Sequence, residues 1–448
     1  MYICALFDTM TDKILSTFFT RVFATLIMFV VVIINTNTFG AEGTGTIALV
    51  ILGLTLLQVL SEFVGGSTLV YLTPQKDNYQ LLILSYAWAL VSNTVDILLL
   101  FILHLVPAEY IIHLLILTFI YSVYNIHTRI MQGHEDIRLF NVLQLSQAVL
   151  LILLLVTLIG ICKVKGLTPS IDLYIYAFIV SYLLPAIGTC FYIAKKVSKT
   201  NLANVGALLK EMVRLGFWTQ LANLAQILTY RISYYIVEGF LGRKSLGIYE
   251  LGTRISEAVW IFPKSICLVQ YARISNNHED EYAKRLTLGL LKIVFVFALL
   301  AVLVLLALPA KFIAWVFGPE FIQAKPVINS LLPGILFLAC MSILSHHFSG
   351  YGKYWINAVG SIIGLTVTAG LGFTLIPAAK EVGTLFALQT AGWISSAAYL
   401  ASLIFTLAVF IRRTHVSWRD FLVSREDIAL FKNICNEKIS SLKHKKSC

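Results

Sequence analysis

The chain has 448 residues, of which 58% are hydrophobic and only 13% are charged. Soluble proteins carry about 25% charged residues, so this composition excludes a soluble globular enzyme and indicates a membrane protein with many spans. The net charge of +11 must be interpreted by position, because basic residues gather in the loops on one side of a membrane as well as in nucleic-acid-binding proteins.

Twelve apolar windows are long enough to cross a membrane as helices. In chain order they fall at about 14–38, 45–68, 81–106, 109–131, 139–161, 172–194, 214–239, 246–271, 286–308, 326–348, 355–377 and 381–411. With the N-terminus inside, about two thirds of the 34 lysines and arginines lie in the loops and terminal segments on that side. The positive-inside rule then places both termini in the cytoplasm, and this excess explains the basic charge without a nucleic-acid partner.

The largest inner loop divides the windows six and six, and a short repeat supports this division. Phe39-Gly40 with Gly45 recurs as Leu241-Gly242 with Gly247 at the same spacing and in the same outer turn of each half. An even number of spans per half predicts two lobes in the same orientation, with a cavity between them. We therefore predict an all-α membrane protein with a six-helix lobe at 1–194, a cytoplasmic loop at 195–213, a second six-helix lobe at 214–411 and a tail at 412–448.

The basic tail has apolar residues at roughly helical spacing from Trp418 to Leu442. This pattern predicts an amphipathic helix that lies on anionic membrane lipid, with a partner-binding helix as the alternative. The seven cysteines are scattered, without a CxxC pair or a Cys/His cluster, and predict neither a disulfide framework nor a metal site. We also expect no cleaved signal peptide, because the first residues lack a cationic segment and a cleavage site.

A charged stripe lies on the predicted eighth helix. Glu250, Arg254, Glu257 and Lys264 fall within an arc of roughly 80° on an ideal helix. A charge that faces lipid at the centre of a span costs about 2.5 to 3.5 kcal/mol, so these side chains should face protein or a water-filled cavity. The stripe is either a structural network that holds helices together or the lining of a transport site.

Other ionisable residues also fall within the predicted spans. Arg231 and Glu238 share one face of the seventh helix, and Arg21, Glu62 and Asp96 lie in the first half. A cluster of charges at the midplane suits an anionic head group or a coupling ion, and a satisfied structural network is the alternative. Glu62 and Asp96 are candidates for carboxylates that couple transport to an ion gradient.

The sequence lacks the motifs of an energy-consuming enzyme. Gly239 to Ser245 only faintly resembles a phosphate-binding loop, since Glu238 and Arg243 replace its glycines. No Ser/His/Asp or paired-carboxylate constellation stands out, and the adjacent His346 and His347 point about 100° apart on a helix. We expect a secondary transporter or facilitated flippase that is not an enzyme and has no cofactor.

Three stretches carry a resemblance to a known family. They are Phe39-Gly40-Ala41-Glu42-Gly43-Thr44-Gly45; Leu241-Gly242 through Gly247-Ile248-Tyr249; and Phe317-Gly318-Pro319-Glu320-Phe321 with Ala324 and Leu331-Leu332-Pro333. Together they resemble the Wzx-type O-antigen and polysaccharide flippases of the multidrug/oligosaccharidyl-lipid/polysaccharide (MOP) exporter superfamily. The resemblance implies a MATE-like fold of two six-helix lobes around a central cavity.

The resemblance also implies a function. Such proteins move a polyprenyl-pyrophosphate-linked oligosaccharide from the cytoplasmic to the outer leaflet of the bacterial inner membrane by alternating access, in surface polysaccharide synthesis. The implied partners are this lipid, membrane lipid, a coupling H⁺ or Na⁺, and polysaccharide polymerase or assembly proteins. On that basis the pyrophosphate would be held by Arg254, Arg231, Arg21 and Lys264, and the sugar would be contacted by Tyr230, Tyr234, Tyr235 and Gln226. The carboxylates Glu250, Glu257, Glu238, Glu62 and Asp96 would form a charge network or couple an ion, a departure from a purely cationic cavity.

The sequence leaves rival functions open. A cation-coupled multidrug antiporter of the same fold would use Glu62 and Asp96 as its working residues. A cell-wall precursor flippase would need several arginines in the first lobe, where only Arg21 is clearly placed. A major-facilitator transporter should carry a charged motif in the second loop, which 71–80 lacks. The loops are too short for the soluble catalytic site of a glycosyltransferase.

Overall fold

The computed structural model describes residues 2–104, 106–200, 202, 205–276 and 279–421. Within these ranges the chain forms helices and no strand. The helices are α1 (Tyr2–Gly65), α2 (Ser67–Leu72), α3 (Asn78–Leu103), α4 (Ile111–Gly133), α5 (Ile137–Val164), α6 (Asp172–Lys196), α7 (Val205–Leu241), α8 (Arg243–Glu257), α9 (Ile261–Asn276), α10 (Asp280–Ala307), α11 (Ala310–Phe317), α12 (Ala324–Gly350), α13 (Tyr354–Val382) and α14 (Thr384–Thr414). Short 3-10 turns lie at Ala108–Tyr110, Ala258–Trp260, Pro319–Gln323 and Trp418–Phe421. Most of the predicted amphipathic tail, residues 422–448, lies outside the described residues.

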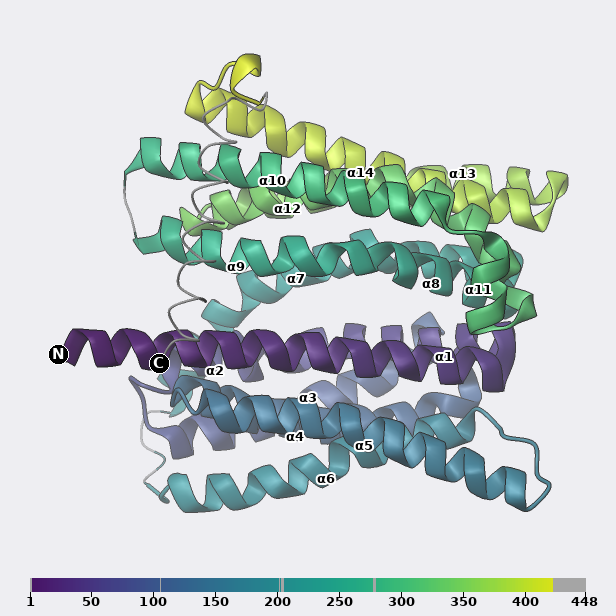
Figure 1. Cartoon of the computed structure of the whole chain (residues 1–448). Helices are drawn as coiled ribbons and strands as arrows, with labels where there is room; N and C mark the ends of the chain where they lie inside the picture. The colour runs from purple at the N-terminus through teal and green to yellow at the C-terminus, as the bar shows by residue number, and fades with distance from the viewer. Residues whose placement is uncertain (1, 105, 201, 203–204, 277–278, 422–448) are drawn as a thin grey trace, which may run out of the picture. The chain divides into compact units, whose positions relative to one another are not determined.

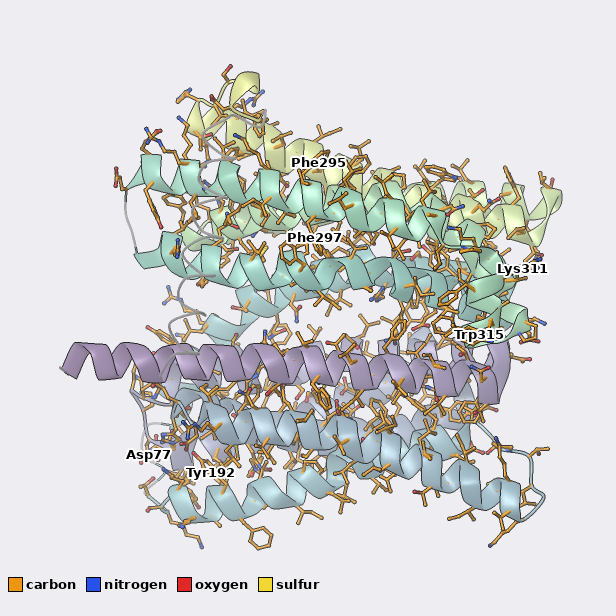
Figure 2. All side chains as sticks on the ribbon, in the orientation of Figure 1. Asp77, Tyr192, Phe295, Phe297, Lys311 and Trp315 are labelled. Atoms are coloured by element: carbon orange, nitrogen blue, oxygen red, sulfur yellow. The ribbon has the colours of Figure 1, made fainter. Side chains whose placement is uncertain are left out.

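The predicted spans correspond to these helices. Nine segments of the described chain are long and apolar enough to cross a membrane, and the first of them, Thr20–Leu72, covers most of the first predicted window and all of the second. The windows 214–239 and 246–271 fall on α7 and on the α8–α9 pair, which are less apolar. The surface of the long helices is rich in apolar groups, such as Phe295 and Phe297 on α10 (Figure 2), as expected where lipid is the solvent.

A glycine turn divides α1 into two spans. Gly40 has φ 65° and ψ −166°, a backbone conformation that residues other than glycine rarely adopt. The chain therefore forms one helix up to Phe39 and a second from Ala41 to Gly65, and the two correspond to the first and second predicted windows. In Figure 1, α1 runs away from the N-terminus and then folds back on itself, as this turn requires.

The predicted single helix at 246–271 is wrong in one respect, because the structure divides it. α8 ends at Glu257, a 3-10 turn occupies Ala258–Trp260, and α9 begins at Ile261. Pro263 provides the physical reason: its nitrogen has no hydrogen to donate, and its ring collides with the carbonyl four residues earlier in a continuous helix. The charged stripe therefore lies on two helices instead of one.

Contacts divide the chain into two compact units. Unit 1 comprises residues 1–253, 309–327 and 368–391, and unit 2 comprises residues 254–308, 328–367 and 392–448. In unit 1, α4 and α6 pack on each other and α1 packs on α4, α5 and α7 (Figure 1). The boundaries of these units differ from the lobe boundary at 195–213, and the two six-helix lobes stay a prediction.

Two glycines let the second and eighth spans touch backbone to backbone within unit 1. A Cβ atom added at Gly45 would lie 2.1 Å from the Arg243 carbonyl oxygen, and one at Gly247 would lie 1.8 Å from the Ala41 carbonyl oxygen. Gly45 and Gly247 are equivalent positions of the sequence repeat, as are Ala41 and Arg243. A reciprocal contact of this kind is the signature of a two-fold relation, and it supports the repeat found in the sequence.

In unit 2, a serine of α14 inserts its hydroxyl between two backbone groups of α12. Pro333 interrupts the hydrogen-bond ladder of α12. The hydroxyl of Ser396 accepts a hydrogen bond from the Gly334 amide at 3.1 Å and donates one to the Ser330 carbonyl at 2.7 Å. Gly334 permits this approach, because a Cβ atom there would lie 2.6 Å from the Ser396 Cα atom. A side chain inserted in this way provides partners for backbone groups next to a proline.

Candidate functional site

Glu62 is the centre of a polar network that joins three helices of unit 1. Asn125 of α4 donates a hydrogen bond to its Oε1 atom at 2.7 Å, and Gln220 of α7 donates to its Oε2 atom at 3.2 Å. The Arg129 guanidinium of α4 lies 3.5 Å from Oε1. The Glu62 side chain is only 15% exposed, so its charge is balanced by protein groups instead of bulk water.

Glycines bring α7 close enough to reach Glu62. A Cβ atom at Gly216 would lie 1.7 Å from the Phe63 carbonyl oxygen, so only a glycine allows α7 to pass this part of α1. Gly66 likewise leaves room beside the Gln220 side chain, which a Cβ atom would approach to 3.1 Å. The network therefore depends on close backbone packing as well as on the polar side chains.

Arg129 extends the network along α4. Its NH1 group donates to Gln132 at 3.2 Å, and its Nε atom is buried without a hydrogen-bond partner among the described residues. Asn223 donates to Gln220 at 3.1 Å on the other side of the network. A carboxylate, a guanidinium and four amides thus form one connected set that could rearrange when a proton or a cation arrives at Glu62.

The polar residues predicted on α7 form a second feature. Gln226 donates to the Tyr230 hydroxyl at 3.1 Å, and Arg231 donates to the Tyr234 hydroxyl at 3.3 Å. The Arg231 guanidinium carbon also lies 5.1 Å from the centre of the Tyr234 ring, a cation–π contact. Within the part of the chain that the structure describes, the Tyr235 hydroxyl is buried and has no hydrogen-bond partner, and Glu238 is partly buried on the next turn. This row combines a cation with aromatic hydroxyls.

The remaining predicted residues lie in different surroundings. Glu250 in unit 1 is buried, and Arg21 on α1 is exposed. Arg254 and Glu257 belong to unit 2 and are partly buried. Lys264, also in unit 2, is exposed and lies 4.7 Å from the centre of the Trp260 ring. The four stripe residues therefore do not share one environment.

Asp96 on α3 is completely buried. Neither of its carboxylate oxygens has a hydrogen-bond partner among the described residues. Ionisable residues inside a membrane span are rare and often functional, which makes Asp96 a candidate ion-coupling group. The structure leaves Asp96 separate from the Glu62 network.

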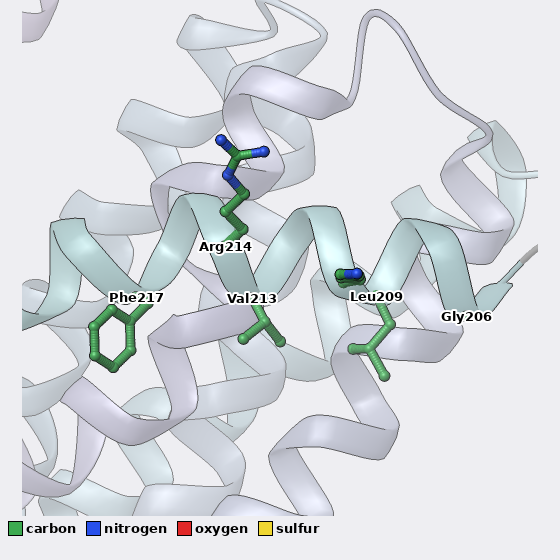
Figure 3. Close-up of a pocket in the computed structure, with 6 residues that line it drawn as sticks. Gly206, Leu209, Val213, Arg214 and Phe217 are labelled. Atoms are coloured by element: carbon green, nitrogen blue, oxygen red, sulfur yellow. The ribbon is translucent and has the colours of Figure 1, made fainter.

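A hollow of about 550 Å³ lies along the first turns of α7 (Figure 3). It is lined by Gly206, Leu209, Lys210, Val213, Arg214 and Phe217. The two cations stand one helical turn apart, and no hydrogen bond or ion pair involves either of them in the described chain. This surface combines positive charge with apolar side chains at the end of a predicted membrane helix.

Most of the Glu62 network was not predicted from the sequence. Arg129, Asn125 and Gln220 were not among the predicted site residues, although the second half of the 109–131 window contains several polar residues, Asn125 and Arg129 among them. Asn125 and Arg129 are four residues apart and therefore share a face of α4. No spacing in the sequence links them to Gln220, which is reached only through the packing of α7 on α1.

The fold is shared with known membrane transporters. No family model and no curated protein matches the chain by sequence. Among solved structures, it is similar to the lipid II flippase MurJ in an inward closed conformation, with a TM-score of 0.69 and 14% identity over 92% of this chain and 89% of that one. It is also similar to an inward-facing multidrug resistance MATE family transporter of the MOP superfamily, with a TM-score of 0.68 and 14% identity over 88% and 94% of the two chains.

An outward-facing MATE transporter of the same superfamily matches with a TM-score of 0.63 and 16% identity, over 90% of this chain and 97% of that one. At such low identity these similarities show the fold alone. The chain is an all-helical, multi-pass membrane protein with the fold of the MOP-superfamily transporters, as the resemblance of its motifs implied.

Proposed function

We propose that the chain is a flippase that moves a polyprenyl-pyrophosphate-linked oligosaccharide from the cytoplasmic to the outer leaflet of a bacterial inner membrane. Transport would proceed by alternating access, with both chain termini in the cytoplasm. The fold supports membrane transport in general, and its structural neighbours include both a lipid II flippase and multidrug transporters. The choice between these two classes depends on the chemistry of the side chains.

The observation that carries the proposal is the row on α7 in which Arg231 contacts Tyr234 and Gln226 contacts Tyr230. A guanidinium binds phosphate through two parallel hydrogen bonds, and tyrosines offer sugars both an apolar face and a hydroxyl. Arg254, Arg21 and Lys264 are proposed as further cations for the pyrophosphate. The carboxylates Glu250, Glu257 and Glu238 would shape the remaining charge network.

The hollow on α7 also supports a lipid-linked anion as the substrate. Lys210 and Arg214 are available to a diphosphate, while Leu209, Val213 and Phe217 offer an apolar surface to the adjoining isoprenoid. A soluble cationic drug would be repelled by the two positive charges. Enrichment of cations at the cytoplasmic end of a span also attracts ordinary anionic lipid, so this feature supports the proposal without carrying it.

The test uses the purified chain in sealed lipid vesicles. A polyprenyl-pyrophosphate oligosaccharide serves as the probe of flipping, and a cationic dye serves as the probe of drug transport. We expect the sugar lipid to cross without dye flux. The Arg231→Ala variant should slow crossing at least about tenfold, because it removes at least one hydrogen bond from a charged group to the pyrophosphate. Arg231→Lys should restore only part of the rate, because lysine cannot form the two parallel hydrogen bonds of a guanidinium.

Lys311→Ala is the matched control, since Lys311 is an exposed cation on α11 (Figure 2). This variant should transport at the rate of the unmodified chain. If Arg231→Ala also transports at that rate while the protein inserts normally, the α7 row does not bind the pyrophosphate.

The second candidate is a cation-coupled multidrug antiporter, and the burial of Asp96 favours it. A buried carboxylate that has no partner among the described residues is suited to take up and release a proton or sodium ion during each cycle. Dye flux that depends on a pH or sodium gradient, with no movement of the sugar lipid, would favour this function.

A further inference from the structure

Glu320 joins the three motifs that carry the family resemblance. Its Oε2 atom accepts a hydrogen bond from the Ala41 amide at 2.9 Å, and its Oε1 atom lies 3.1 Å from the Lys244 ammonium. Ala41 begins the second span of α1, Lys244 lies in the first turn of α8, and Glu320 follows α11. One carboxylate thus connects three segments that are far apart in the sequence, all within unit 1.

The contact with Ala41 has the chemistry of a helix cap. The amide of Ala41 is one of the first groups of its helix and has no partner within that helix. A carboxylate at this position satisfies the amide and interacts favourably with the positive end of the helix dipole. Gly40 makes the approach possible, since a Cβ atom there would lie 3.0 Å from the Glu320 carboxylate and would also strain the backbone.

Other contacts secure the same end of unit 1. Asn37 donates a hydrogen bond to the Val316 carbonyl at 2.8 Å and so ties the first span to α11. Arg243 and Glu109 form an ion pair at 3.7 Å between α8 and the turn before α4. The glycine crossing of Gly45 and Gly247 brings the start of α8 against the second span.

Buried side chains show that these segments are closed on one another. Thr44 is 5% exposed and Ser245 is 6% exposed, although each lies within five residues of a turn at this end of the molecule. The ion pair between Lys244 and Glu320 adds little to this closure. The Lys244 and Glu320 side chains are 62% and 44% exposed, and exposed ion pairs contribute little stability.

We propose that Glu320 is the latch of a gate formed by the Gly40 turn, the start of α8 and the 3-10 turn at Pro319–Gln323. In the closed state its carboxylate holds the second and eighth spans together through the Ala41 amide and the Lys244 ammonium. Opening breaks both interactions and separates the glycine crossing. The inference rests on the proposed transport by alternating access, and it assigns the gate of that cycle at this end of the molecule.

The latch can be measured without any substrate. In a cysteine-free background, Ser245→Cys places a nearly isosteric thiol at a site that is buried in the closed state. The purified full chain in detergent is treated with a water-soluble maleimide, and the rate of labelling reports the fraction of open molecules. Because the probe acts in solution, the result does not depend on the orientation of the chain in a membrane.

Glu320→Ala should raise the labelling rate about 2- to 30-fold, the effect of losing a helix-capping group on a two-state equilibrium. Glu320→Gln keeps an acceptor for the Ala41 amide and should give a smaller increase. Lys244→Met removes only the exposed ion pair and should raise the rate no more than about fivefold. Glu381→Gln, which alters an exposed glutamate of α13, is the matched control and should leave the rate unchanged.

Labelling of Glu320→Ala at the rate of the unmodified chain would overturn the proposal. If that variant fails to give a monodisperse protein, the ranking of Glu320→Gln and Lys244→Met against the control decides the question, and equal rates refute the latch. A faster rate in Glu320→Ala, combined with no transport of sugar lipid by the unmodified chain, would retain the gate and refute the proposed substrate.

Discussion

The glycine crossing offers a quantitative test of the structure. Gly247→Ala would put a Cβ atom 1.8 Å from the Ala41 carbonyl oxygen, whereas ordinary contact begins at 3.4 Å. The two helices must therefore separate by about 1.6 Å, and overpacking of this kind typically costs about 1 to 3 kcal/mol. Gly45→Ala faces the reciprocal oxygen of Arg243 at 2.1 Å, so we expect a similar loss.

The double variant, Gly45→Ala with Gly247→Ala, tests whether the two glycines share one contact. Once one alanine has moved the helices apart, the second needs little further movement, so the combined loss should be smaller than the sum of the two single losses. The measurement is the thermal stability of the purified protein in detergent, followed as the fraction that stays monodisperse on heating. Gly160→Ala is the control, because nothing lies within 4 Å of its added Cβ atom. It should be neutral or slightly stabilising, since alanine favours a helix.

Two results would refute this reasoning. If Gly247→Ala is as stable as Gly160→Ala, the backbones do not cross as closely as the structure shows. If the two losses add in full, the glycines act at independent sites and the reciprocal contact is wrong.

Three further predictions follow from buried polar groups. Glu62→Ala leaves Arg129 partly buried without its carboxylate and should destabilise the protein by about 1 to 3 kcal/mol, measured by the same thermal assay; an unchanged melting temperature would contradict the network. Ser396→Ala removes the partner of the Gly334 amide and should lower the stability of the protein by about 1 to 3 kcal/mol. Ser396→Thr keeps a hydroxyl and should recover part of this loss. Equal stability of both variants and the unmodified chain would argue against the inserted hydroxyl. Asp96→Asn should leave folding intact and abolish the dependence of vesicle transport on pH or sodium, and a retained dependence would exclude Asp96 as the coupling group.

Much of the fold could be predicted from the sequence. Spans were predictable because a bilayer demands about twenty apolar residues per helix, and the apolar windows correspond to the observed helices. The place of the Gly40 turn was also predictable, since Gly40 belongs to a repeated glycine pattern. The interruption after α8 was missed, although Pro263 was its visible cause. The short helix α11 was missed as well, because Ala310–Phe317 is too short to span a membrane and was included in the turn before the tenth window.

The candidate site was only partly predictable. Glu62, Asp96 and Arg231 could be identified from the sequence, because ionisable residues within apolar helices are rare and costly. Their partners could not. Asn125, Gln220 and Arg129 are ordinary polar residues whose importance comes from their distance to Glu62, and the turn motifs gave no sign that Glu320 reaches both Ala41 and Lys244.

The sequence by itself determined which segments enter the membrane, where the chain turns and which residues carry charge into the apolar region, because hydropathy and glycine conformation act locally along the chain. Only the tertiary structure decided which of these residues meet. Helices that are apolar on most faces have many ways to pack, and the arrangement is selected by close backbone contacts at Gly45, Gly216 and Gly247 together with polar groups from distant helices. Those contacts join residues up to 279 positions apart, as between Ala41 and Glu320, and no local pattern encodes them.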